Sequence, residues 1–204
     1  MVHRAPKGNI PAEEALRKLK EGNRLFVDKA EYCGDITVER IIDAADNGQH
    51  PYAAIVSCSD SRVIPEVIFS AGIGELFVIR TAGNIVDDIN TYGSLEYAVD
   101  HLGCKLIVVL GHTKCGAIAE ALNGFNEGHS LQIIKVITDA IGDEKDPDKA
   151  SRLNVENSVR EISEGKEGRE GLMVIGAMYD IDHGNVEFFE RSSQNYDVLQ
   201  LLNH

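Results

Sequence analysis

Two short segments of the chain carry residues that suit metal chemistry. Residues 58–62 read Cys-Ser-Asp-Ser-Arg, and residues 112–115 read His-Thr-Lys-Cys. Each segment follows an apolar run of strand length, and in open parallel α/β sheets the ligand-binding residues lie beyond the carboxyl ends of the strands. If the two strands are neighbours, the side chains of Cys58, His112 and Cys115 converge on one point.

Two thiolates and one imidazole form a ligand set that suits zinc. Three protein ligands leave the fourth tetrahedral position open for water, as catalytic rather than structural sites require. A lone cysteine after a strand is more often a small buried apolar residue, but the His-x-x-Cys pair after a second strand favours a metal site.

Asp60 and Arg62 lie two residues apart, close enough for a charge-assisted bidentate pair. Such a pair has two interpretations. It is either a structural ion pair at the end of a strand, or it holds the Asp60 carboxylate ionised and oriented to accept a hydrogen bond from a zinc-bound hydroxide.

The elements that must position these residues alternate between helices and short apolar strands. Periodicity and capping signals predict helices over 12–26, 38–46, 94–102 and 116–122, and a helical region over 130–162 that is interrupted at 142–147. Apolar runs predict strands over 52–57, 76–80, 105–110 and 172–177. The expected α/β fold is a mostly parallel central sheet flanked by helices on both faces. A turn at 182–185 followed by residues 186–189 adds an antiparallel edge strand.

Length, composition and charge indicate one acidic globular domain. The 204 residues include 20 Lys plus Arg and 33 Asp plus Glu, for a formal net charge of −13. We interpret 1–204 as a single domain, with an N-terminal helical arm over 1–50 and an α/β core over 51–204. An acidic chain lacks the basic surface that nucleic acids and anionic membranes need. No signal peptide or membrane span is evident in the sequence, so we expect a cytoplasmic protein without a disulfide framework.

The two motifs together resemble those of the β-class carbonic anhydrases. The resemblance covers most of the chain and includes residues 21–27, 80–84, 95–99 and 179–181, whereas the stretch from 125 to 171 is less distinctive. It implies one zinc ion per subunit, held by Cys58, His112 and Cys115. It also implies that Asp60 and Arg62 form the catalytic pair.

The resemblance further implies a set of substrate contacts. Gln49 falls where the plant-like branch of the family has a glutamine that hydrogen-bonds the substrate, and Phe77 and Tyr97 fall on the apolar wall of its pocket. Gly116 follows the last zinc ligand, as in that branch. The family pattern implies a homodimer, or a higher oligomer such as a tetramer, in which Gln49, Phe77 and Tyr97 line a site at the subunit interface and the arm lies over the partner.

A regulatory feature of the other branch is missing from this sequence. That branch has a tryptophan three residues before the first cysteine, where it helps to form a non-catalytic bicarbonate site. This chain has Ile55 at that position and no tryptophan at all. We therefore expect the plant-like, non-allosteric type.

The activity implied is the reversible hydration of carbon dioxide to bicarbonate and a proton. Two thiolates make zinc a weaker acid than three imidazoles do, so activity should rise with pH through the neutral to alkaline range. Three other functions remain open. They are a hydrolase for carbonyl sulfide or carbon disulfide on the same scaffold, a non-catalytic zinc-binding protein, and a thiol redox protein that uses Cys115.

Overall fold

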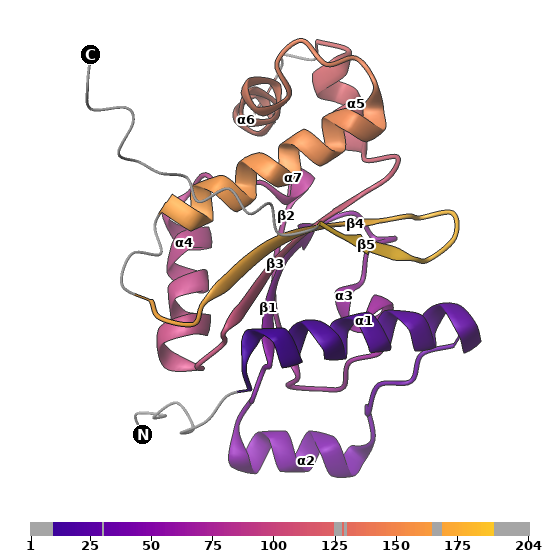
Figure 1. The fold of residues 1–204 in the computed structure, drawn as a ribbon, viewed down its shortest axis with the longest axis vertical. Helices are drawn as coiled ribbons and strands as arrows, with labels where there is room; N and C mark the ends of the chain where they lie inside the picture. Colours follow the sequence, from indigo (N-terminus) through magenta and orange to yellow (C-terminus); the bar gives the residue numbers. More distant parts are fainter. Residues whose placement is uncertain (1–9, 30, 125–127, 129, 165–168, 190–204) are drawn as a thin grey trace.

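A five-stranded sheet forms the centre of the computed structural model, which describes residues 10–29, 31–124, 128, 130–164 and 169–189 (Figure 1). The strand order is β2-β1-β3-β4-β5. The first four strands pair in parallel, and β5 pairs antiparallel to β4, so the predicted fold class is confirmed. The strands are β1 (Ala53–Cys58), β2 (Leu76–Thr81), β3 (Leu106–His112), β4 (Met173–Tyr179) and β5 (Val186–Phe188).

Helices cover both faces of this sheet. The helices of the described residues are α1 (Ala12–Lys29), α2 (Val38–Asn47), α3 (Pro65–Ile68), α4 (Ile89–Glu96), α5 (Gly116–Leu122), α6 (Leu131–Ile141) and α7 (Pro147–Glu164), together with a 3₁₀ turn, η1 (Ala82–Asn84), and a π-helical turn, η2 (Tyr97–His101). One apolar cluster joins α1 and α3 to the sheet, and a second joins α4, η2 and α7 to its other face. None of the described helices is both long enough and apolar enough to cross a membrane.

The two central strands end at the residues on which the chemistry depends. Every residue of β1 and of β3 is buried, because each strand has a neighbour on both sides and a helix layer on both faces. Both strands continue further than their apolar runs predicted. Cys58 is therefore the last residue of β1, and His112 is the last residue of β3.

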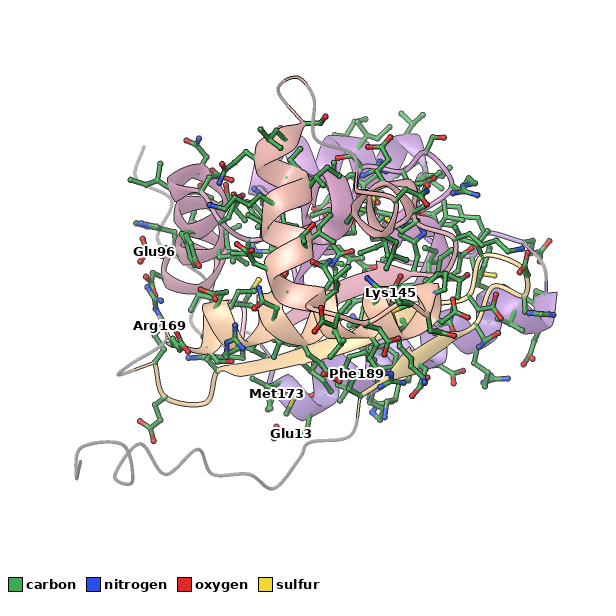
Figure 2. All side chains as sticks on the ribbon, turned by 90° about the horizontal axis from the view of Figure 1, so that it is seen from above. Glu13, Glu96, Lys145, Arg169, Met173 and Phe189 are labelled. Carbon is green, nitrogen blue, oxygen red and sulfur yellow. The ribbon has the colours of Figure 1, made fainter. Side chains whose placement is uncertain are left out.

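Helix α4 begins earlier than its predicted start at residue 94. The Asp88 side chain caps it by accepting hydrogen bonds from the backbone N–H groups of Asn90 (2.7 Å) and Thr91 (3.1 Å). Asn, Thr and Gly in its first turns are weak helix formers and hid this start. Arg169 donates hydrogen bonds to Glu96, the last residue of α4 (Figure 2), and to Asp100 in the following turn η2.

The first helix of the predicted arm packs on its own chain. Ala15 and Leu19 are buried against the sheet. At Gly22 the helix approaches α3 so closely that an added Cβ would lie 1.8 Å from the carbonyl oxygen of Phe69. The Asn23 side chain donates to the carbonyl of Gly184 (2.9 Å) and accepts from the N–H of Val186 (2.9 Å), which ties α1 to the turn between β4 and β5.

The second helix of the arm is exposed in the single chain. No residue of α2 is buried, and Val38, Ile41 and Ile42 present large apolar side chains at its surface. The two helices of the arm therefore differ, because α1 is part of the core of its own chain and α2 leaves an apolar face uncovered.

Candidate metal centre

Three potential metal ligands meet where β1 and β3 end. Cys58, His112 and Cys115 offer one ligand atom each, and these atoms all lie within 4.8 Å of one another. The residues are 5%, 1% and 5% exposed. Because β1 and β3 are parallel neighbours, their carboxyl ends bring two sequence segments to one edge of the sheet, as the sequence predicted.

The imidazole of His112 is oriented as a metal ligand. Its Nδ1 lies 2.9 Å from the carbonyl oxygen of Thr113. That oxygen only accepts hydrogen bonds, so Nδ1 must carry the proton, and the lone pair then resides on Nε2. Nε2 is buried and has no hydrogen-bond partner. A buried acceptor without a partner is costly, and a metal ion held with the two sulfurs would satisfy it.

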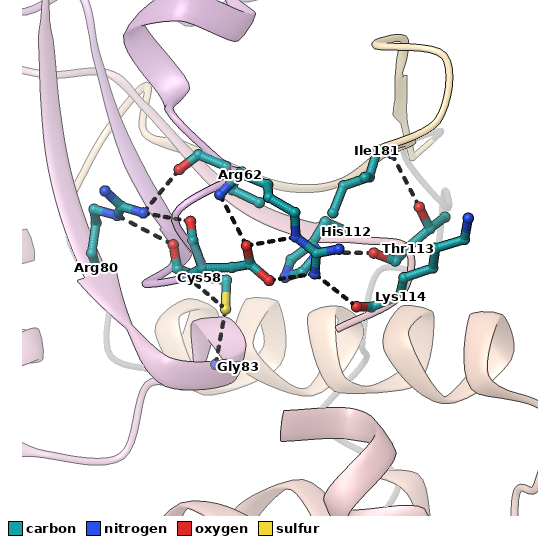
Figure 3. Close-up of polar contacts among 10 residues, drawn as sticks. Cys58, Arg62, Arg80, Gly83, His112, Thr113, Lys114 and Ile181 are labelled. Atoms are coloured by element: carbon teal, nitrogen blue, oxygen red, sulfur yellow. Dashed lines mark hydrogen bonds and ion pairs between the residues drawn. The ribbon is translucent and has the colours of Figure 1, made fainter. Parts of the chain in front are cut away.

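The sulfur of Cys58 lies in surroundings that stabilise a thiolate. The sulfur of Cys115 lies within 4.8 Å of it. The backbone N–H groups of Asp60 and Gly83 approach it at 3.4 Å each, and Figure 3 shows the contact with Gly83. The hydrogen bond from Cys115 does most to lower the pKa of Cys58, against the opposing effect of burial, and the same contact raises the pKa of Cys115. Two cysteine sulfurs this close together suit a divalent cation, because a metal ion deprotonates the thiols that coordinate it.

The predicted ion pair between Asp60 and Arg62 is present beside these ligands. Oδ1 of Asp60 accepts from the backbone N–H and from Nε of Arg62, both at 2.9 Å, and Oδ2 accepts from Nη2 at 2.6 Å. This bidentate contact holds the pKa of the Asp60 carboxyl well below its usual value. Nη2 of Arg62 also donates to the carbonyl of Lys114 at 3.1 Å, which links the two ligand-bearing segments.

The segment from His112 to Cys115 is anchored to the β4–β5 turn. The backbone N–H of Ile181 donates to the Thr113 hydroxyl (3.1 Å), and Nζ of Lys114 pairs with Asp182 (2.6 Å). Lys114 adopts a left-handed backbone conformation with φ +56°, which is strained for a residue with a side chain. Contacts with a distant turn therefore help to fix a sharp bend between two metal ligands.

The structure does not bring all the predicted site residues to this place. Phe77 pairs with Ala54 near the start of β1, and the Phe77 ring lies 6.1 Å from that of Tyr97. Gln49 precedes β1 and lies against Gly74. These three predicted pocket residues therefore lie toward the amino end of the strands. Gly116 directly follows Cys115 as the first residue of α5, with open space beside its α carbon.

Two residues to which the sequence analysis assigned no role contact the metal-ligand segment. The N–H of Gly83 reaches the sulfur of Cys58 because Gly83 has φ +70°, a conformation that glycine adopts without strain. The Arg80 side chain donates to the main chain around Cys58 (Figure 3). Both lie in segment 80–84, which the sequence analysis noted for its family pattern.

The known proteins similar to this chain share one description. A family model described as carbonic anhydrase matches residues 53–186. Carbonic anhydrase 2 of Mycobacterium tuberculosis is 46% identical over 114 residues, which are 56% of this chain and 54% of that protein. The match thus spans about half the length of that relative. A Pseudomonas aeruginosa carbonic anhydrase is 33% identical over 74% of this chain and 79% of its own.

Solved structures show the same fold. A structure from work on two tetrameric β-carbonic anhydrases of the filamentous ascomycete Sordaria macrospora superimposes with a TM-score of 0.64 at 32% sequence identity. The superposition covers 87% of this chain and 97% of that chain. The similarity therefore includes most of the described sheet and its helices.

Proposed function

The chain belongs to the β-class carbonic anhydrases, and on this premise we propose that it catalyses the reversible hydration of carbon dioxide to bicarbonate and a proton, with one zinc ion per subunit. The observation that carries the proposal is the convergence of Cys58, His112 and Cys115 beside an Asp–Arg pair. Three ligands leave a fourth position for catalysis. Neither a purely structural zinc site nor a thiol redox site accounts for the Asp60–Arg62 pair.

The chemistry that zinc supplies when bound is Lewis acidity, which makes hydroxide available near neutral pH. The protein must orient this nucleophile. Arg62 keeps Asp60 ionised, so the Asp60 carboxylate acts only as an acceptor. Oδ1 already accepts two hydrogen bonds from Arg62 and Oδ2 accepts one, so Oδ2 keeps a lone pair for the proton of the nucleophile. By accepting that proton, Asp60 would leave a lone pair of the nucleophile free for the carbon of carbon dioxide.

We further propose that a second copy of the chain completes the substrate pocket. Within one chain, Phe77 and Tyr97 are separated from Cys58 by most of the length of β1, so they do not line its metal site. Tyr97 is 44% exposed, and α2 exposes apolar side chains, as expected of surfaces that pack against another subunit. A homodimer is the smallest assembly that supplies the pocket, and a tetramer built from two such dimers is compatible with it. The Sordaria macrospora proteins are described as tetrameric.

The cytoplasm is the proposed location. All four cysteines lie in described parts of the chain and are unpaired, including the exposed Cys33. Free thiols are typical of reducing compartments. Subcellular fractionation of the native protein tests this placement.

The test of the proposed function is stopped-flow hydration of carbon dioxide by the zinc-loaded protein at alkaline pH, with the Asp60→Asn variant measured in parallel. Fast turnover should fall by about 10² to 10⁴ in the variant, because the nucleophile loses its orienting acceptor. Asp28→Asn is the matched control, since Asp28 also pairs with an arginine but lies exposed on α1. Zinc content is measured in all three proteins.

The outcome separates the remaining functions. A zinc-loaded protein that does not hydrate carbon dioxide would contradict the proposal. Turnover of carbonyl sulfide or carbon disulfide by that same protein would then identify a hydrolase, and no turnover of any of the gases would identify a zinc-binding protein without catalysis.

A further inference from the structure

The side chain of Arg80 spans the segment in which the chain leaves β1. Arg80 lies on β2, opposite Ser57 in the register of the neighbouring strand. Its Nε donates to the carbonyl of Cys58 (3.2 Å), and its Nη2 donates to the carbonyls of Asp60 (2.7 Å) and Val63 (2.9 Å) (Figure 3). One guanidinium therefore holds three main-chain carbonyls within a segment of six residues.

These contacts depend on the shape of the arginine side chain. A guanidinium presents five N–H donors in one rigid plane, whereas the ammonium of lysine is a single point of charge. Among the described residues, all the hydrogen bonds of the Arg80 side chain go to main-chain carbonyls and none goes to a carboxylate. The charge of Arg80 is thus directed at the backbone of this segment.

Arg62, which belongs to this segment, makes a different set of contacts. Arg62 binds the carboxylate of Asp60 and the carbonyl of Lys114, whereas Arg80 binds the main chain of Asp60. The two arginines therefore fix different parts of one residue. Because Arg80 also binds the carbonyl of Cys58, the same side chain constrains the backbone of a metal ligand and of the adjacent carboxylate.

We propose that Arg80 is a positioning residue, which sets the place of the Cys58 sulfur and of the Asp60 carboxylate relative to one another. This proposal rests on the proposed function, since it assigns Cys58 to zinc and Asp60 to the nucleophile. Arg80 reaches both through the backbone, so its loss displaces the ligand and the acceptor together.

The test compares Arg80→Lys and Arg80→Gln with the wild-type protein. Zinc affinity is measured by competition with a chromophoric chelator, and the visible absorption of the cobalt-substituted protein reports the geometry of the ligands. Loss of a group that orients a metal ligand typically lowers metal affinity about 10- to 100-fold. Both variants should show that loss of zinc affinity and a changed cobalt spectrum. Lysine at position 80 should not restore zinc affinity, because a positive charge alone does not hold three carbonyls.

Arg152→Gln is the control for removing an arginine that joins two elements. Arg152 pairs with Glu187 on β5, at the sheet edge opposite β2. This variant should keep wild-type zinc affinity and the wild-type cobalt spectrum even if its melting temperature falls.

Several outcomes would overturn the proposal. The first is wild-type zinc affinity together with an unchanged cobalt spectrum in Arg80→Lys. The second is a loss of zinc affinity that Arg152→Gln shares. The third is the failure of both Arg80 variants to fold, which would assign Arg80 to stability alone. Failure of the proposed function is a separate result. If the wild-type protein does not hydrate carbon dioxide but Arg80→Lys still weakens zinc binding, the placing of Cys58 by Arg80 stands and the reaction must be revised.

Discussion

The predicted site residues lie at both ends of the parallel strands, but a single chain brings them together only at the carboxyl end. At the carboxyl end, Cys58, His112 and Cys115 converge within one chain, and the backbone N–H of Asp60 approaches the sulfur of Cys58. At the amino end, Phe77 pairs with a residue about 13 Å before the end of β1. One chain therefore assembles the groups that could hold a metal, while Gln49, Phe77 and Tyr97, which are expected to contact substrate, lie toward the opposite end of the strands. The difference indicates that metal binding and substrate binding depend on different levels of structure.

The largest effect is expected from removing a ligand at the carboxyl end. His112→Ala leaves two thiols and a small cavity, so the variant should retain little zinc and only background hydration activity. His101→Ala, on the amino-end side beside Tyr97, should keep its full zinc content. Zinc is measured by elemental analysis after dialysis. Stoichiometric zinc in His112→Ala would mean that His112 is not a zinc ligand. It would contradict the placing of the metal site at the carboxyl end.

A mixing experiment tests whether the two ends meet across a subunit interface. Homodimers of Asp60→Asn and of Gln49→Ala should each have low activity. In a mixed dimer, one site combines the intact Asp60 of one chain with the intact Gln49 of the other, so a statistical mixture should recover about a quarter of wild-type activity. The two chains are co-expressed with different tags and the activity is measured by stopped flow.

The complementation has a clear contrary result. If Gln49 acted in its own chain, each site of the mixed dimer would lack one of the two residues. No activity beyond that of the separate variants would then be recovered. Co-expression of each variant with a differently tagged copy of itself controls for changes in the amount of folded protein.

The pH dependence should reside at the carboxyl end alone. Arg62 lowers the pKa of Asp60, so Asp60 stays ionised at neutral pH and its titration causes no change in activity in that range. Hydration activity should rise from neutral to alkaline pH, because two thiolate ligands weaken the acidity that the metal confers on water. Gln49→Ala should lower the rate at every pH without moving the profile, since the amide does not titrate. A profile of zinc-loaded wild type that is flat between neutral and alkaline pH would contradict this assignment.

The smallest expected effect is on the free energy of unfolding, when a side chain near the amino ends of the strands is truncated in the isolated subunit. Tyr97 is 44% exposed, so Tyr97→Ala should change the free energy of unfolding of the dilute, dissociated subunit by about 0.5 kcal/mol or less. Leu106→Ala, at the fully buried first residue of β3, should cost about 2–5 kcal/mol. Urea unfolding at low protein concentration measures both. A large loss in Tyr97→Ala would mean that its ring supports the fold of one chain.

Much of the fold was predictable because its signals are local. Buried apolar runs marked the four parallel strands, and a turn at 182–185 marked the antiparallel edge. The start of α4 was missed, because the weak helix formers after its Asp88 cap gave no periodic pattern. The packing of α1 on its own sheet was also not evident, since an amphipathic helix buries its apolar face equally well on its own chain or on a partner.

The sequence by itself determined the residue types of the metal centre and the edge of the sheet at which they meet. It could do so because parallel strands end side by side and the ligand motifs directly follow the strand-forming runs. Only the tertiary structure decided which groups orient those residues. The reach of Arg80 to three carbonyls and the N–H of Gly83 at the sulfur of Cys58 depend on how backbone groups face one another across β1 and β2. Every residue has these backbone groups, so residue identity along the chain does not reveal which of them will meet.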